Sequence, residues 1–323
     1  MKMFEKNVGT TKYLKSWKTK ALVTSIVSVL PGNDQIYQAL QHRFGRLISD
    51  PFEQLAASSE IFKNLGHSIQ IPTKQPQVFE IGTGHEPLFP ISWFLCGSGS
   101  IVTVDLYRRL NLRIFHLSLK AMAANPTRIF ELYEGLVDKK VLKERFEIIV
   151  KYQDDPVLLL EKANIVYRAP YDATNVDYKD GTFDFHFSNN VLEHIDPKSL
   201  KDILIEGKRI LKSNGIAMHK FDESDHFAHT DRSITSINFL KFSKKAWKII
   251  GGNQYTFANR LRESDYIKIF EQIGFKILKK ISKIDLTAKL EFKSSFRVHS
   301  DFAEYEIDDL CTESTMIVAA PVK

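Results

Sequence analysis

Short apolar runs alternate along this chain with longer segments whose apolar residues recur at helical spacing. The short runs predict buried strands, and glycine or proline marks most of their ends. Strands that alternate with helices favour a mostly parallel sheet with helices on both faces. The expected strands are 77–81, 101–104, 165–167, 183–187, 216–221, 275–281 and 316–320, and the expected helices between them are 108–124, 197–211 and 264–273.

Helical patterns also occur outside this alternation. Residues 1–74 form an expected helical extension, in which 35–48 and 52–65 carry apolar residues at helical spacing. Residues 127–162 form an expected helical insertion. The domain prediction is therefore a helical extension over 1–74 and a sheet domain over 75–323, whose segment 222–262 is expected to contact a substrate.

Composition places the chain among ordinary globular proteins, with 43% hydrophobic and 26% charged residues in 323. The net charge of +6 would suit an anionic acceptor. However, the lysines are spread along the chain without a dense basic run, so a nucleic-acid partner is not expected. Cys96 and Cys311 are too few for a disulfide framework or a cysteine zinc site, which fits a reducing, cytoplasmic location.

The apolar stretch 21–30 follows several lysines, as a signal peptide would. It is too short to span a bilayer, and it contains Thr24, Ser25 and Ser28 with no Ala-x-Ala site after it. We expect an amphipathic helix here and no transmembrane segment. Contact with a membrane surface is the alternative.

The loop after the first expected strand carries the first candidate chemistry. Gly82 and Gly84 let a ligand approach the backbone closely, and Asp105 ends the second strand 21 residues later. A carboxylate at that position can accept hydrogen bonds from both hydroxyls of a ribose. Pro87 stands where a nicotinamide-binding loop needs its third glycine, and Glu80 would repel a pyrophosphate. The loop therefore favours an adenosyl ligand without phosphates.

In these motifs the sequence resembles the class I S-adenosylmethionine-dependent methyltransferases. The resemblance rests on 78–84, on the acidic motif 102–105, on 183–195 and on 210–216, in that order and at that spacing. It departs from the family's pattern at 85–87, where many members have another glycine. The resemblance implies a Rossmann-like α/β fold with a seven-stranded sheet, and S-adenosylmethionine as the cofactor.

The same resemblance assigns roles to single residues. It implies that the loop from Glu80 lines the methionine part of the cofactor, and that Asp105 takes the ribose with Leu106 against the adenine. The acidic residue of a later loop accepts from the adenine amino group, and the residue at the end of the fourth strand lies under the sulfonium. The implied set is Glu80, Gly82, Thr83, Gly84, Asp105, Leu106, Asp172, Ala173 and Asn189.

The segment 222–231 supplies candidates for the reaction itself, because methylation of a hydroxyl group needs a base or a metal. His226 and His229 lie there among carboxylates, with Asp231 as a third catalytic candidate. The three interpretations, in order of preference, are a general base, a solvated polar loop and a divalent-metal site. His194, in the motif after the fourth strand, is expected to be structural.

The chain also resembles bacterial methyltransferases found with polysaccharide-biosynthesis genes. That resemblance rests on 80–90, 225–231, 238–243, 259–262 and 265–266. It implies a carbohydrate or other small hydroxyl acceptor, with Arg260 or Arg262 holding an anionic group unless they only form salt bridges. The N-terminal helices and the 127–162 insertion would then cap the acceptor pocket.

Three other functions stay open. An RNA or protein methyltransferase would share the core motifs, and a nicotinamide oxidoreductase would share the sheet. A binding protein without catalysis could retain the same fold, although the glycines and the acidic positions are intact.

Overall fold

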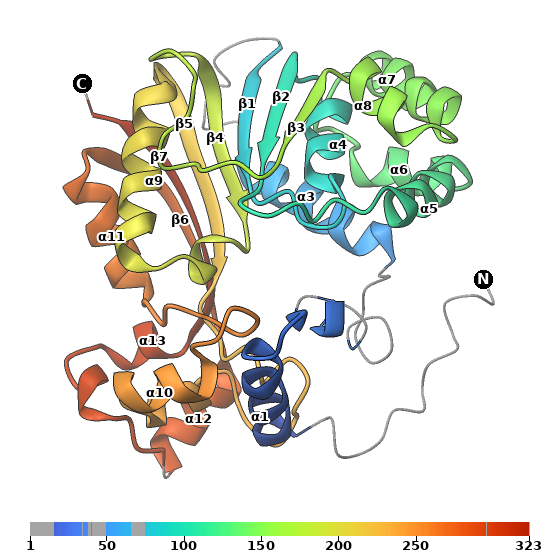
Figure 1. Ribbon diagram of the computed structural model, residues 1–323. Helices are drawn as coiled ribbons and strands as arrows, with labels where there is room; N and C mark the ends of the chain where they lie inside the picture. The colour runs from blue at the N-terminus through green and yellow to red at the C-terminus, as the bar shows by residue number, and fades with distance from the viewer. Residues whose placement is uncertain are drawn as a thin grey trace.

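A computed structural model describes residues 16–33, 35–37, 40, 50–65, 75–294 and 296–322. In this part of the chain seven strands form one sheet in the order β3-β2-β1-β4-β5-β7-β6 (Figure 1). The strands β3, β2, β1, β4 and β5 run parallel, and β7 runs antiparallel to both of its neighbours. The strands are β1 (Gln77–Ile81), β2 (Ser100–Val104), β3 (Ile165–Arg168), β4 (Phe183–Asn189), β5 (Leu211–Asp222), β6 (Phe275–Ile284) and β7 (Thr312–Pro321).

Helices cover both faces of this sheet, as the alternating pattern predicted. Strand β1 shows the arrangement, because Val78 packs in one apolar cluster and its neighbour Phe79 packs in another. The helices are α1 (Trp17–Ser28), α3 (Pro51–Leu65), α4 (Leu88–Leu95), α5 (Leu112–Ala123), α6 (Pro126–Leu132), α7 (Lys139–Tyr152), α8 (Pro156–Lys162), α9 (Pro197–Ile210), α10 (Lys244–Gly251), α11 (Glu263–Gln272), α12 (Leu286–Ser294) and α13 (Ile307–Leu310).

The predicted insertion is helical and consists of α6, α7 and α8. Its apolar residues join the same cluster as α3, α4 and α5, and α8 contacts β3 at the edge of the sheet. In Figure 1 these helices lie beside β3, on the far side of the sheet from β6 and β7. The insertion therefore extends the core at one edge of the sheet.

A separate helical lobe lies beyond the carboxyl end of β5 (Figure 1). We define it as α1, the segment 222–262 with α10, and the segment 285–311 with α12 and α13. These parts share an apolar cluster that includes Ala21, Trp247 and Phe302. The N-terminal extension is thus divided: α1 belongs to the lobe, while α3 packs with α4 against the sheet.

Two element boundaries differ from the predicted ones for local reasons. Strand β5 begins at Leu211 instead of residue 216, and Lys212 reaches back to the buried Asp184 carboxylate at 2.9 Å. Helix α5 begins at Leu112 because the Asn111 side chain accepts from the N–H groups of Arg113 and Ile114. The helix expected at 35–48 falls largely outside the described residues.

His186 of β4 and His219 of β5 are buried side chains on these two neighbouring strands. His186 Nδ1 is 3.1 Å from His219 Nε2, and Ser188 Oγ is 2.7 Å from His219 Nδ1. Burial lowers the pKa of His186 to about 3, and it lowers the pKa of His219 well below its usual value. Both rings are therefore neutral in the folded protein at neutral pH.

This pair predicts a loss of stability in mild acid. Below about pH 6.5 these two histidines become protonated in the unfolded chain, whereas in the folded protein both buried rings stay neutral. The contribution of this pair to stability therefore falls as the pH falls. The buried carboxyls of Glu80 and Glu193, whose pKa is raised to about 8, act with the opposite sign, so the histidine contribution is measured as a difference between two proteins in urea denaturation. Relative to the parent, the variant His186→Phe, which keeps an aromatic ring beside Phe79, should lose about 1 kcal/mol less stability between pH 7 and pH 5.5. An equal change in both proteins would contradict the assignment.

Candidate active site

The loop after β1 is held against the ends of two neighbouring strands. Gly82 N–H donates to Val104 O at 2.7 Å, and Gly84 N–H donates to Asp105 Oδ2 at 3.1 Å. Gly82 has φ +84°, and a Cβ atom there would lie 2.3 Å from Val191 Cγ2, in the loop after β4. Only glycine fits at this position, so the loops after β1, β2 and β4 meet at one point.

The loop after β3 joins the same edge. Tyr171 N–H donates to Asp105 O at 2.9 Å, which places Asp172 and Ala173 beside the end of β2. Asp172 is exposed and caps Thr174 N–H, whereas Ala173 is buried. Leu106, next to Asp105, is 56% exposed, so its apolar side chain is accessible to a ligand.

Two buried polar groups at this edge lack full compensation. Glu80 is buried, and although Thr103 donates to it at 2.5 Å, burial and the nearby Asp105 raise its pKa to about 8. Thr83 Oγ1 lies 2.6 Å from Thr103 Oγ1 and continues this chain of contacts. Asn189 Oδ1, at the end of β4, is buried with no hydrogen-bond partner among the described residues. Unsatisfied groups of this kind mark ligand sites more often than ordinary core.

A cavity lies next to this edge, where the helical lobe meets the sheet. It is lined by the short helix η2 (Leu192–His194), the segment 222–227, Lys20 of α1 and the segment 255–261. Since η2 begins three residues after Asn189, the same loop borders both the glycine loop and the cavity. Burial lowers the pKa of His194, and the positive charge of Arg109, in the loop after β2, lowers it further.

Asp222, which lines the cavity, forms an acid–imidazole pair with His229, which is not among the residues that line it. His229 Nε2 is 3.3 Å from Asp222 Oδ2 and 3.0 Å from Ser224 Oγ. The contact with Asp222 raises the pKa of His229. Burial alone would raise the pKa of Asp222, but His229, His226 and Ser224 together lower it to about 2. A carboxylate that is ionised at neutral pH therefore orients a half-exposed imidazole.

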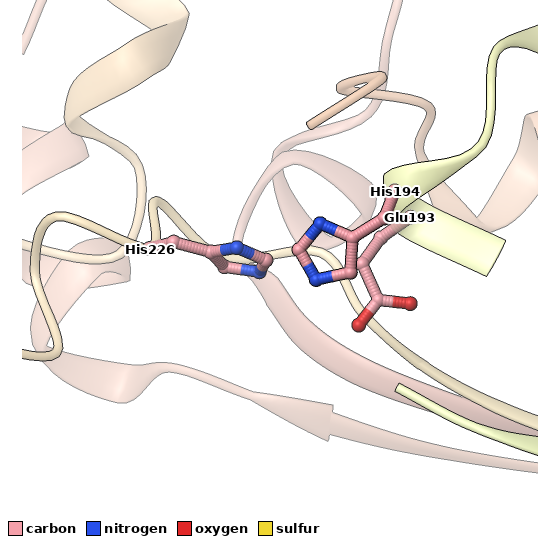
Figure 2. A group of neighbouring side chains, drawn as sticks. All are labelled: Glu193, His194 and His226. Atoms are coloured by element: carbon pink, nitrogen blue, oxygen red, sulfur yellow. The ribbon is translucent and has the colours of Figure 1, made fainter. Parts of the chain in front are cut away.

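His226 and His194 lie inside the cavity wall with Glu193 (Figure 2). The rings of His194 and His226 are 4.9 Å apart, and the rings of His226 and His229 are 5.2 Å apart. Burial lowers the pKa of His226 to about 4 and raises the pKa of Glu193 to about 8. The nearby backbone N–H groups of Glu193 and Asp222 offset part of this rise in the pKa of Glu193, although neither makes a hydrogen bond to its carboxyl oxygens.

The sequence interpretation missed Glu193 and treated His194 as structural, with catalysis as the lesser alternative. The signal that could have found them is their position directly after the fourth strand, at the carboxyl edge of a parallel sheet. Their closeness to His226 comes from the tertiary fold, since 32 residues separate His194 from His226.

The family model described as "Methyltransferase domain" matches residues 149–219, which run from α7 to β5. The seven-stranded order with an antiparallel β7 agrees with that match. The chain carries an S-adenosylmethionine-dependent methyltransferase domain.

Solved structures resemble this methyltransferase domain only distantly. A geranyl diphosphate methyltransferase in complex with S-adenosylmethionine has a TM-score of 0.46 and 12% identity, over 92% of this chain and 94% of that one. Magnesium protoporphyrin IX methyltransferase of Synechocystis has a TM-score of 0.43 and 13% identity, over 83% of each chain. A methyltransferase of Methanosarcina mazei has a TM-score of 0.42 and 14% identity, over 79% of this chain and 96% of that one. None of the curated proteins compared with the chain matches it.

The structure corrects two of the residue roles expected for the methyltransferase. Asp231 is buried and accepts from Trp17 N–H at 2.8 Å and from Ser233 N–H at 2.9 Å, so it fastens α1 to the lobe instead of acting in catalysis. Arg262 is fully buried and donates to Glu223 O and Thr312 O at 2.6 Å each. It cannot reach an acceptor, because its donors already bind carbonyl groups.

The remaining predicted parts of the acceptor side are divided. Arg260 lines the cavity, although it donates to Phe239 O and Phe242 O at 3.1 and 2.7 Å. The described N-terminal helix α1 borders the cavity through Lys20, whereas no residue of the 127–162 insertion lines it. None of the described helices has the length and apolar character needed to cross a membrane.

The different placement of the two arginines predicts different effects of replacement. Arg262→Met leaves the buried carbonyl groups of Glu223 and Thr312 without their donor, so we expect a loss of about 3 kcal/mol in the free energy of unfolding. Arg260→Met should cost less stability, because Arg260 lies partly exposed at the cavity. Urea denaturation of both variants checks this. Equal stability of the Arg262 variant and the parent protein would contradict the structural role.

Proposed function

We propose that the methyltransferase methylates a hydroxyl group of a small polar acceptor, with carbohydrate as the preferred class. One observation supports this most strongly: the glycine loop and the histidine-lined cavity are joined by the single loop that follows β4. The cavity combines aromatic walls from Phe239 and Trp247 with ionisable groups. Such a lining suits a small ligand that needs both stacking surface and polar contacts.

The cofactor would lie across the ends of β1, β2 and β4. Asp105 would accept from the ribose hydroxyls, with Leu106 and the segment of Asp172 and Ala173 about the adenine. Glu80, Thr83 and the two glycines would surround the methionine part. A sulfonium cation nearby would favour the ionised form of Glu80, whose pKa burial raises to about 8. The unpartnered Asn189 oxygen would face the same cation.

The reaction would be an in-line displacement. The acceptor oxygen attacks the methyl carbon, the carbon–sulfur bond breaks, and its electron pair returns to sulfur to leave a neutral thioether. A proton must leave the acceptor oxygen, and His229 is the proposed base with Asp222 holding the imidazole. His226, which lines the cavity beside His229, would help to position the acceptor.

The cofactor assignment predicts that Asp105→Ala weakens binding of S-adenosylmethionine. Loss of two charge-assisted hydrogen bonds should raise the dissociation constant about 100-fold or more. Isothermal titration calorimetry measures this directly. Asp154→Ala is the matched control, since it removes an exposed carboxylate paired with Lys120. If both variants bound the cofactor as the parent does, the cofactor assignment would be wrong.

The base assignment predicts a different pattern for His229→Ala. The cofactor dissociation constant should stay within about twofold, while turnover on the true acceptor should fall about 100-fold or more. His116→Ala, in α5 and paired with Asp154, is the matched control. A panel of sugars, lipids, proteins and RNA identifies the acceptor. Turnover confined to RNA or protein would overturn the small-acceptor proposal, and full turnover by the His229 variant would exclude it as the base.

A further inference from the structure

We propose that Glu193, His194 and His226 form a binding site for a divalent transition-metal ion. Each residue offers one ligand atom, and these three atoms lie within 4.8 Å of one another. Figure 2 shows the imidazole rings of His194 and His226 side by side, with the Glu193 carboxylate next to His194. Glu193 and His194 come from η2 after β4, and His226 comes from the segment after β5, so the fold joins the two halves of the site.

The buried groups of this cluster lack the partners that an ordinary core would give them. Glu193 is 3% exposed, and neither of its carboxylate oxygens has a hydrogen-bond partner among the described residues. The Nε2 atom of His226 is likewise buried and has no hydrogen-bond partner there. Burying an uncompensated carboxylate is costly, and a cation between Glu193 and His226 would remove that cost.

The orientation of His194 supports a ligand role. Its Nδ1 atom is 2.9 Å from Phe257 O, and because a carbonyl only accepts, Nδ1 carries the hydrogen. The lone pair of the neutral ring is then on Nε2, the nitrogen available for a metal. Metal-binding histidines commonly donate their other N–H to a backbone carbonyl in this way, which fixes both the tautomer and the ring.

The ligand set indicates which ions fit. Two imidazoles and one carboxylate suit zinc, manganese, iron(II) or cobalt, whereas magnesium and calcium prefer oxygen ligands alone. Asp222 adds a second negative charge near the site, with Oδ2 3.9 Å from His226 Nε2. Three protein ligands leave at least one coordination position open, and all three residues line the cavity.

The role of the ion rests on the proposed function, whereas the arrangement of its three ligand residues does not. An ion held here would bind and orient the acceptor hydroxyl oxygen in the cavity, beside the His229 imidazole that would take the proton. Acceptors with a hydroxyl able to reach a metal would be selected over those without one.

The test measures metal binding itself, apart from activity. The full chain is stripped with chelator and dialysed, and then titrated with Zn²⁺ and with Co²⁺. We expect one ion per chain by elemental analysis, and a visible Co²⁺ spectrum typical of mixed nitrogen and oxygen ligands. The variants Glu193→Gln and His194→Gln should each weaken binding about 10- to 100-fold or more. His116→Ala, whose imidazole lies near Asp154, should bind as the parent does.

Two outcomes would overturn the metal site: no stoichiometric binding by the parent chain, or unchanged affinity in the folded His194 variant. His194 is exposed, so its replacement tests the site even if the buried Glu193 variant fails to fold. Calorimetry with S-adenosylmethionine on the same stripped protein separates the two proposals. Cofactor binding without metal binding would refute only the metal site, and metal binding without cofactor binding would refute only the methyltransferase assignment of the loops.

Discussion

The contact between Gly82 and Val191 is the constraint on which the site depends. The missing side chain at Gly82 lets the loop after β4 come against the loop after β1, with no room for even a methyl group. Val191 is followed at once by η2, so this contact also fixes where Glu193 and His194 stand. The separation between the glycine loop and the cavity is thereby set by the Val191 side chain packed against the Gly82 backbone. Methyl transfer depends on such alignment more than on strong acid or base chemistry.

Three polar groups with incomplete hydrogen bonding lie along this same edge. Glu80, Asn189 and Glu193 come from three places in the chain, and each is buried or nearly so with incomplete hydrogen bonding. A stable core would have exchanged such residues for apolar ones or supplied donors. By contrast the buried Asp184, at the start of β4, is fully paired with Lys212. The contrast within one strand indicates that the carboxyl end of the sheet is arranged for ligands and its opposite end for stability.

Much of the sheet could be predicted from the sequence, and the reasons are local. Strand 77–81 was predicted with its observed bounds because a buried run meets a glycine turn, and the helical insertion was found from its spacing alone. Arg260 and Arg262 look equivalent in the sequence, yet one lines the cavity and the other is enclosed by the carbonyls of Glu223 and Thr312. Only the antiparallel return of β7 brings Thr312 to that position. Asp231 is a similar case, because its partner Trp17 is 214 residues away.

The helical lobe supplies much of the wall of the cavity that is proposed to bind the acceptor. Arg262 donates to Glu223 O within the lobe and to Thr312 O at the start of β7 in the sheet. The lobe is therefore anchored to the sheet by a buried cation with several fixed partners, which loses more on displacement than a surface contact would. Since Lys20, Trp247 and Arg260 reach the cavity from this anchored lobe, the shape offered to an acceptor is set by segments outside the sheet. In the proposed function, the strand ends would therefore bind the methyl donor and the lobe would select the acceptor.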